Sequence, residues 1–255
     1  MSRRTSAAMT RVVPLCLLLW THAAQATITI GTGSTLDLAD GTLALGCSDL
    51  VVAGQVKGAS AHADAIANLT IAAGGVLAPG GSQLTLGGNF ADSGAFAPGT
   101  SFIAIVDACG NGVSQVSGST NFYDFAVASA SGKQIVLPAA LTQTVAHSLT
   151  LHGASANLLR VISSAAGQQA LLALGGAALQ SISYVDARDN KASDATIAPG
   201  APAQFHSTDN GNLSNWFAAT SPIGDSTVAV PGLNMWGLLV LGLSAMTLAL
   251  RRLRT

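Results

Sequence analysis

The chain has 255 residues, of which 49% are hydrophobic and only 9% are charged, and its formal net charge is −1 at pH 7. Between residues 27 and 229, five basic side chains stand against twelve aspartates, a net charge of −7, and this acidic balance argues against nucleic acid as a partner. The chain has no glutamate and 28 glycines, so residues that favour helix surfaces are scarce, and the composition argues against a mainly helical fold.

Residues 1–26 have the features of a secretory signal peptide. A basic region with three arginines precedes a short apolar segment at 12–20, and Ala24 and Ala26 frame a small-residue cleavage site. The apolar residues expected directly after a twin-arginine pair are missing, which favours general secretion. We therefore predict that the export machinery and signal peptidase act on this segment, leaving Thr27 as the mature N-terminus.

The exported body, residues 27–217, alternates aliphatic and small polar residues. This period of two predicts short β-strands with aliphatic side chains on one face, and glycine-rich segments between them predict turns. One stretch, 168–179, has the Ala and Leu content of a helix, although Gly175 and Gly176 interrupt it. The clearest alternating stretches are 27–30, 35–38, 42–45, 68–71, 83–86 and 148–151.

Short strands separated by Gly, Asn and Ser turns are typical of a parallel β-solenoid. Each coil of about twenty residues would supply two or three strands, and the coils would stack about 4.8 Å apart around an aliphatic interior. The body has room for about eight or nine such coils. An all-β parallel solenoid is therefore the predicted fold, and a β-sandwich made of the same strands is the alternative.

Two cysteines, Cys47 and Cys109, remain in the body after removal of the signal peptide. An even pair in an oxidising compartment is a candidate disulfide. Two free, buried thiols are the alternative, because the distance between the residues cannot be deduced from the sequence.

The search for catalytic and metal-binding patterns finds none that is specific. His147 and His152 flank the predicted strand 148–151, and two solvated turn residues explain them better than a metal or acid–base pair. Aspartates at 186–194 have a spacing compatible with Ca²⁺, but Arg188 and Lys191 would oppose a cation, which favours a turn capped by Asp and Asn. We predict a protein that is not an enzyme and has no cofactor.

The middle of the body loosely resembles the filamentous-type surface repeats of secreted bacterial proteins. The similarity implies an extended, β-rich surface protein and no particular reaction. The segments that carry it are 88–99, 121–125, 131–138 and 142–145, with 184–190 and 209–216 similar to a closing segment.

After the body, the pattern predicts a linker and then a membrane segment. Residues 218–229 contain Pro and Gly without alternation, as in a linker. The uncharged stretch 233–250 would span roughly 27 Å as a helix, which is enough to cross the hydrocarbon core of a bilayer. The arginines after it would keep the C-terminus on the cytoplasmic side and the body outside.

The segment 230–255 resembles the IPTL-CTERM class of bacterial sorting signals, relatives of the PEP-CTERM tails. That class has the pattern Ile-Pro-Thr-Leu-Ser-x-Trp-Gly, an apolar helix and terminal arginines; here Val230 replaces Ile, Gly232 replaces Thr and Asn234 replaces Ser. The resemblance implies processing by an exosortase-like protease. An ordinary single-pass anchor is the alternative. The residues of the predicted sorting signal are Val230, Pro231, Leu233, Trp236, Gly237, Arg251, Arg252 and Arg254.

These segments together predict an exported structural or adhesive protein of the bacterial surface. It would be held in the inner membrane by its C-terminal helix, and after processing it would reach the cell surface or the medium. The alternative is a carbohydrate-binding or carbohydrate-active solenoid, and a plain spacer is a third possibility. Aromatic residues near polar clusters would form the sugar-binding face: Phe122, Tyr123, Phe125, Tyr184, Phe205 and Trp216.

Overall fold

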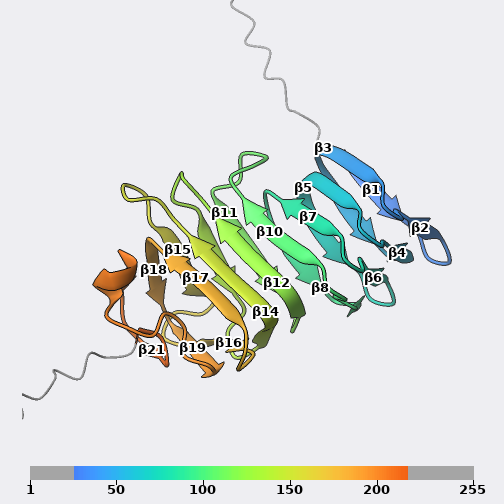
Figure 1. The fold of residues 1–255 in the computed structure, drawn as a ribbon. Helices are drawn as coiled ribbons and strands as arrows, with labels where there is room; N and C mark the ends of the chain where they lie inside the picture. The colour runs from blue at the N-terminus through green and yellow to red at the C-terminus, as the bar shows by residue number, and fades with distance from the viewer. Residues whose placement is uncertain (1–25, 218–255) are drawn as a thin grey trace, which may run out of the picture.

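In a computed structural model, which describes residues 26–217, the chain forms a parallel β-solenoid of about nine coils (Figure 1). Its strands pair in parallel with the equivalent strands of the next coil. Leu50 pairs with Leu69, 19 residues later, whereas Leu149 pairs with Gln180, 31 residues later, so the coils differ in length. The predicted solenoid is confirmed, and the sandwich alternative is wrong because a sandwich is built from antiparallel strands.

The strands form two sheets. The four-stranded sheet contains β2 (Thr35–Asp37), β4 (Gln55–Lys57), β6 (Val76–Ala78) and β9 (Ala95–Phe96). The 17-stranded sheet bends around the corners of the coil and contains β1 (Thr27–Ile30), β3 (Thr42–Val52), β5 (His62–Ile71), β7 (Gln83–Leu86), β8 (Phe90–Asp92), β10 (Phe102–Val106), β11 (Val113–Ser117), β12 (Asn121–Ala128), β13 (Gln134–Leu137), β14 (Thr142–His152), β15 (Leu159–Ser163), β16 (Ala170–Leu174), β17 (Leu179–Ser183), β18 (Val185–Arg188), β19 (Asn190–Asp194), β20 (Thr208–Asp209) and β21 (Leu213–Ser214).

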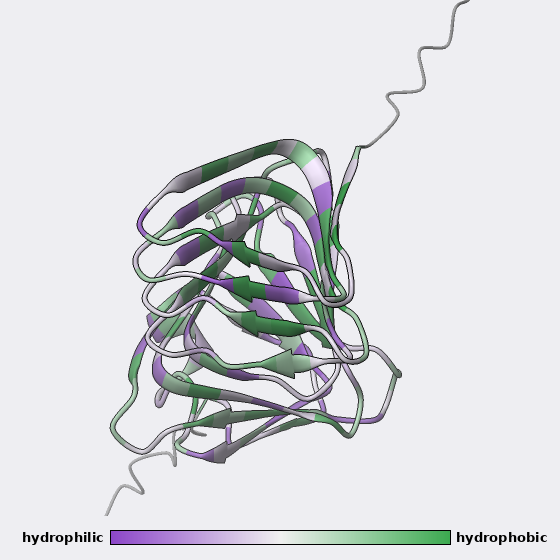
Figure 2. Cartoon of the chain, turned by 90° about the vertical axis from the view of Figure 1, so that its right-hand side faces the viewer, coloured by the Kyte–Doolittle hydropathy of each residue, from purple (hydrophilic) through white to green (hydrophobic). Residues whose placement is uncertain are grey.

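The interior consists of columns in which equivalent positions of successive coils stack on one another. Hydrophobic and hydrophilic residues alternate along many of the strands (Figure 2). Because successive side chains of a strand point to opposite faces, this alternation places the aliphatic residues on the inner face. The column members are almost completely buried, so each coil covers the apolar residues of its neighbour. One column contains Leu84, Ile103, Phe125 and Leu149, and another contains Leu86, Ile105, Val127 and Leu151.

The stretch with helical composition, 168–179, forms β16 and the start of β17 instead of a helix. Residues 171–174 pair with residues 142–145 of β14, which supply the backbone partners of a ladder. Leu172 and Leu174 are buried in the interior, and the Gly175 N–H donates to the Val145 carbonyl where the strand ends. Tertiary pairing therefore overrides the local helix propensity.

The two ends of the described stack differ. At the C-terminal end, a 3-10 helix (Pro202–Phe205) and the buried side chains of Trp216 and Phe217 close the interior. At the N-terminal end, β1 pairs only with β3, and Ile28 is 37% exposed. The first and last described residues lie at opposite ends (Figure 1), which nine coils at about 4.8 Å each separate by roughly 40 Å.

The predicted signal peptide, linker and sorting tail lie outside the described residues, apart from Ala26 at the signal-peptide boundary. Within the described range, 26–217, there is no helix of the length and apolarity needed to cross a bilayer.

Candidate functional site

The segment 107–112, which follows β10, departs most clearly from a regular stack. Its Cys109 forms a disulfide with Cys47 in β3, and the two Cα atoms are 5.3 Å apart. The strands β5 and β7 lie between β3 and β10 in the ladder. The segment therefore folds back over two coils to reach Cys47. We call this region, formed by 107–112 with Cys47, Gly87 and Lys133, the disulfide corner.

Two glycines allow the segment to lie directly on the coil beneath it. A side chain at Gly87 would collide with the backbone of Ala108, and one at Gly88 would collide with the side chains of Asn68 and Asn111. Glycine is needed where two backbones approach this closely. The Gly87-Gly88 pair, which the sequence marks only as a turn, is the surface on which the segment rests.

Lys133 is completely buried beneath this segment. Its ammonium group donates to the carbonyl oxygen of Gly87 at 2.8 Å, to Ser114 Oγ at 3.2 Å and to the carbonyl oxygen of Asn111. Burial lowers the pKa of Lys133, and the nearby negative charge of Asp107 works in the opposite direction. Because its partners come from different coils, one side chain ties three coils together.

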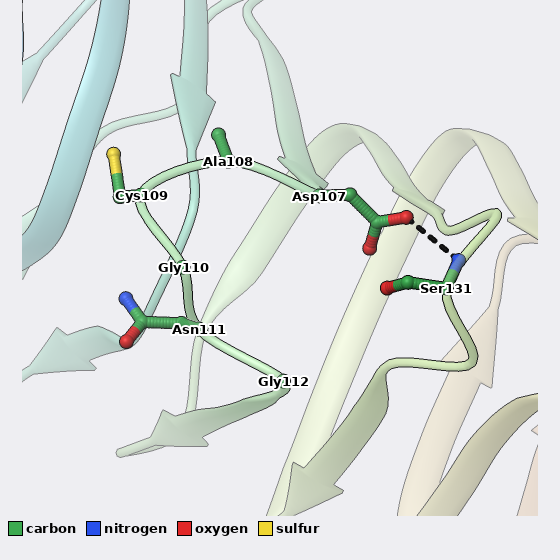
Figure 3. A pocket seen from close by; sticks show the side chains of 7 residues that line it. All are labelled: Asp107, Ala108, Cys109, Gly110, Asn111, Gly112 and Ser131. Atoms are coloured by element: carbon green, nitrogen blue, oxygen red, sulfur yellow. Dashed lines mark hydrogen bonds between the residues drawn. The ribbon is translucent and has the colours of Figure 1, made fainter.

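Asp107 connects the segment to the following coil. Its Oδ2 accepts a hydrogen bond from the backbone N–H of Ser131 at 2.9 Å (Figure 3). It also accepts one from the backbone N–H of Ala130 at 2.7 Å. Partial burial acts to raise the pKa of Asp107, but hydrogen bonds with Ser129, Ser131 and Ala130 outweigh it and hold the pKa below its ordinary value. A shallow pocket of about 310 Å³ lies between the segment and Ser131.

Each reactive group of the disulfide corner is engaged in holding coils together. The Cys109 sulfur is in the disulfide, the Lys133 ammonium has three acceptors, and Asp107 accepts from the backbone. Family models, curated proteins and solved structures were compared with the chain, and none matched. The assignment of a role therefore rests on the geometry and on the sequence pattern.

A polar ladder runs along the outside of the stack near the disulfide corner. Asn68 Nδ2 donates to Asp49 Oδ1 at 2.8 Å, the Asn89 N–H donates to Asn68 Oδ1 at 2.9 Å, and the Gln115 N–H donates to Asn89 Oδ1 at 2.8 Å. Each side chain thus satisfies a backbone or side-chain group one coil away. The sequence analysis did not identify this ladder, although the recurrence of Asp49, Asn68 and Asn89 at near-coil intervals was a usable signal.

The two histidines on either side of the predicted strand 148–151 do not lie in the turns that the sequence predicted. His147 and His152 both belong to β14 and do not flank a shorter strand, because the pairing with β12 continues across the bend. His147 Nδ1 lies 2.7 Å from Asp124 Oδ1, whereas His152 Nε2 lies 2.8 Å from Ser181 Oγ. They have separate partners. Among residues 26–217, no three His, Cys, Asp or Glu side chains are grouped to hold a metal ion.

Of the aspartates at 186–194, Asp189 lies at the corner between β18 and β19, whereas Asp186 is inside β18 and Asp194 ends β19, so the predicted turn is confined to Asp189 and the rest of the segment forms strands. Asp189 has a positive φ between β18 and β19, and its Oδ1 accepts from Asn212 Nδ2 at 2.6 Å. Asp186 Oδ1 accepts from Asn210 at 2.8 Å. The hydrogen bond from Asn212 lowers the pKa of Asp189. The carboxylates of Asp186 and Asp189 are thus each paired with an asparagine of the following coil.

The aromatic residues expected to form a sugar-binding face lie mainly in the interior. Phe122, Phe125 and Trp216 are almost completely buried, and Phe205 packs against the core. The two tyrosines stack on histidines, Tyr123 on His147 with centroids 4.6 Å apart and Tyr184 on His206 at 4.9 Å. The expectation was wrong for Phe122, Phe125 and Trp216, which are buried in the interior, and for Phe205, which is partly buried against it.

Proposed function

We propose that the protein is an exported bacterial surface or extracellular protein, in which the solenoid is a structural or adhesive scaffold. Its delivery would depend on the IPTL-CTERM-like tail. One observation carries the proposal. β1 begins at Thr27, directly after the predicted signal-peptidase site, and the buried Trp216 and Phe217 close the fold directly before the predicted linker. Removal of the signal peptide would therefore leave every strand in place and remove one backbone hydrogen bond, from the Asp49 N–H to the Ala26 carbonyl oxygen.

The position of the two ends also supports a scaffold. A tail that follows Phe217 would leave the closed end of the stack and place the open end roughly 40 Å farther from the membrane. The disulfide between Cys47 and Cys109 suits an oxidising, exported compartment. The body would therefore be a short, covalently reinforced stalk.

The carbohydrate alternative has less support. A sugar-binding groove is usually lined by exposed aromatic and polar side chains, but Phe122, Phe125 and Trp216 are buried. The faces of Tyr123 and His147 cover one another with the ring planes 10° apart. We therefore advance the scaffold and not the carbohydrate-active protein.

The test is the intact mass of the protein recovered separately from the membrane and the medium of its native host. We expect a species that begins at Thr27 and ends within a few residues of Pro231, away from the inner membrane. The variant carrying both Pro231→Ala and Trp236→Ala should retain Arg254 and stay in the inner membrane. Pro222→Ala, in the predicted linker, is the matched control and should be processed normally.

A wild-type species that begins at Thr27, retains Arg254 and stays in the inner membrane would contradict the sorting part of this proposal. It would leave an ordinary anchored β-domain. A species that retains residues before Thr27 would contradict the predicted cleavage.

A further inference from the structure

Besides its disulfide and its ionisable groups, the disulfide corner contains an Asn-Gly pair, Asn111-Gly112. In such a pair the backbone nitrogen of the glycine can attack the side-chain carbonyl carbon of the asparagine, because glycine has no side chain to hinder the approach. Within residues 26–217, neither the side-chain amide of Asn111 nor the N–H of Gly112 has a hydrogen-bond partner. The Asn111 side chain is therefore free to turn toward the Gly112 nitrogen.

Lys133 is placed to assist this attack. The Gly112 nitrogen becomes a nucleophile when it loses its proton, and the negative charge then spreads onto the backbone carbonyl oxygen of Asn111, because the peptide bond is conjugated. The Lys133 ammonium group donates a hydrogen bond to that oxygen. A fixed, positively charged donor at the atom where negative charge develops lowers the barrier of a reaction. The lysine that ties three coils together would thus also activate a peptide nitrogen.

We propose that Asn111 is a site of spontaneous deamidation that Lys133 promotes. The Gly112 nitrogen gives its proton to water and bonds to the Asn111 side-chain carbonyl carbon. The bond from this carbon to Nδ2 then breaks, and Nδ2 takes a proton from water and leaves as ammonia. Water opens the resulting succinimide at either carbonyl, which gives aspartate or isoaspartate. Water has access, since Asn111 and Gly112 line the shallow pocket of the corner and Gly112 is exposed.

The second Asn-Gly pair of the chain, Asn210-Gly211, is held in an unreactive arrangement. Asn210 Nδ2 donates to Asp186 Oδ1 at 2.8 Å, which restrains the side chain. The Gly211 N–H donates to Asp209 Oδ1 at 2.8 Å. A carboxylate beside the nitrogen disfavours the negative charge that the attack requires. The two pairs share a sequence and differ in their surroundings, so they can be compared within one molecule.

Deamidation would loosen the disulfide corner. Isoaspartate adds a methylene group to the backbone of a segment that lies directly on Gly87 and Gly88. A tightly packed site accommodates an added methylene only by shifting its neighbours. The Asn111 carbonyl oxygen would then leave its position at Lys133, while the Cys47–Cys109 disulfide would remain. The corner would therefore weaken as each molecule ages.

The experiment is peptide mapping by mass spectrometry of the full chain, kept folded and oxidised at neutral pH and sampled over time. We expect Asn111 to gain about one mass unit, through loss of ammonia and addition of water, about tenfold faster than Asn210. In urea with the disulfide reduced, the two sites should react at similar rates, because the structure that distinguishes them is lost. Equal rates in the folded protein, or a faster reaction at Asn210, would overturn the proposal.

Two variants test the chemistry at the site. Gly112→Ala should slow the reaction at Asn111 about tenfold, because its methyl group hinders the approach. It should keep the fold, since that methyl group has no neighbour within 4 Å. Lys133→Met, measured while circular dichroism shows it folded, should also slow Asn111 and leave Asn210 unchanged, whereas Lys57→Met is the matched control and should react like wild type. An unchanged rate at Asn111 in Gly112→Ala or in folded Lys133→Met would show that the proposal is wrong.

Discussion

At the scale of single residues, the unexpected feature is a charged side chain inside an apolar stack. Burying an ammonium group is costly unless hydrogen bonds compensate for the lost water. Lys133 has three acceptors, from Gly87, Asn111 and Ser114, and these come from coils that must stay in register for the bonds to form. These hydrogen bonds therefore form only when the coils are stacked in register, and they also stabilise that stacking.

Lys133→Met should lower the free energy of unfolding by about 2 to 3 kcal/mol, because two carbonyl oxygens and a hydroxyl group lose their donor. Urea unfolding followed by circular dichroism measures the change. The matched control is Lys57→Met on the exposed face of β4, which we expect to stay within about 0.5 kcal/mol of wild type. Equal effects of the two substitutions would contradict a structural role for the buried ammonium group.

The lowered pKa of Asp107 predicts that the free energy of unfolding depends on pH in the acid range. Its pKa in the folded protein lies below the ordinary value of 3.8, so the folded state binds fewer protons than the unfolded state in that range. Its contribution is present above pH 3.8 and is lost as the pH falls through the folded pKa. Asp107→Asn should therefore be less stable than wild type by about 1 kcal/mol near pH 6, and the difference should shrink below pH 3.8. A difference that is independent of pH would contradict this explanation.

At the scale of elements, the segment 107–112 shows how a loop becomes part of the stack. It leaves β10, crosses two coils and is held by one covalent and several polar contacts. The segment lies on Gly87 and Gly88, so the shape of one coil depends on the absence of side chains in another. A substitution in the underlying turn should therefore disturb the loop above it.

Gly87→Ala should lower the free energy of unfolding by about 2 kcal/mol, because the new methyl group meets the backbone of Ala108 and the segment must lift. Gly112→Ala is a control within the same corner, since a methyl group there has no neighbour within 4 Å. Thermal unfolding of the two variants gives the comparison. If Gly112→Ala is as destabilising as Gly87→Ala, close backbone approach is not the reason for the glycine.

The strands were predictable because they depend on local alternation, whereas the disulfide corner depends on which coils become neighbours. In the stretches 83–86 and 148–151, the period of two identifies which side chains are buried. Lys133 carries no such signal, since its partners lie 19 to 46 residues away along the chain. The disulfide between Cys47 and Cys109 could not be predicted for the same reason. The coils vary from 19 to 31 residues in length, so the sequence does not show which coils become neighbours.

At the scale of the whole molecule, the stack is reinforced unevenly. The disulfide joins β3 to the segment after β10, and the buried lysine acts at the same place. From β14 onward, the described stack is held by its strand ladders, its interior and corner hydrogen bonds, and its end is closed by Trp216 and Phe217. In a stack whose coils contact mainly their neighbours, stability can differ between the two halves.

Replacing both Cys47 and Cys109 with Ser should lower the free energy of unfolding by about 4 kcal/mol, the chain-entropy value for a loop closed over a separation of 62 residues. Hydrogen exchange should show the loss in β3 to β10 and little change in β16 to β19. Wild-type protein treated with reductant is the control and should behave like the double variant. A uniform loss of protection over all coils would show that the stack unfolds as one unit.

The path of segment 107–112 also determines how the stalk would respond to tension. In the proposed scaffold, a pull between the open end and the predicted membrane tail would be transmitted through the backbone, and coils without a covalent cross-link could peel away and lengthen the chain. The disulfide would carry the force directly from Cys47 to Cys109, which are separated by 62 positions in the sequence, so the stretch between them is bypassed. This stretch would have a contour length of roughly 210 Å when fully extended, and it would not extend while the disulfide is intact. The body would lengthen from its two flanks while its reinforced section remained coiled.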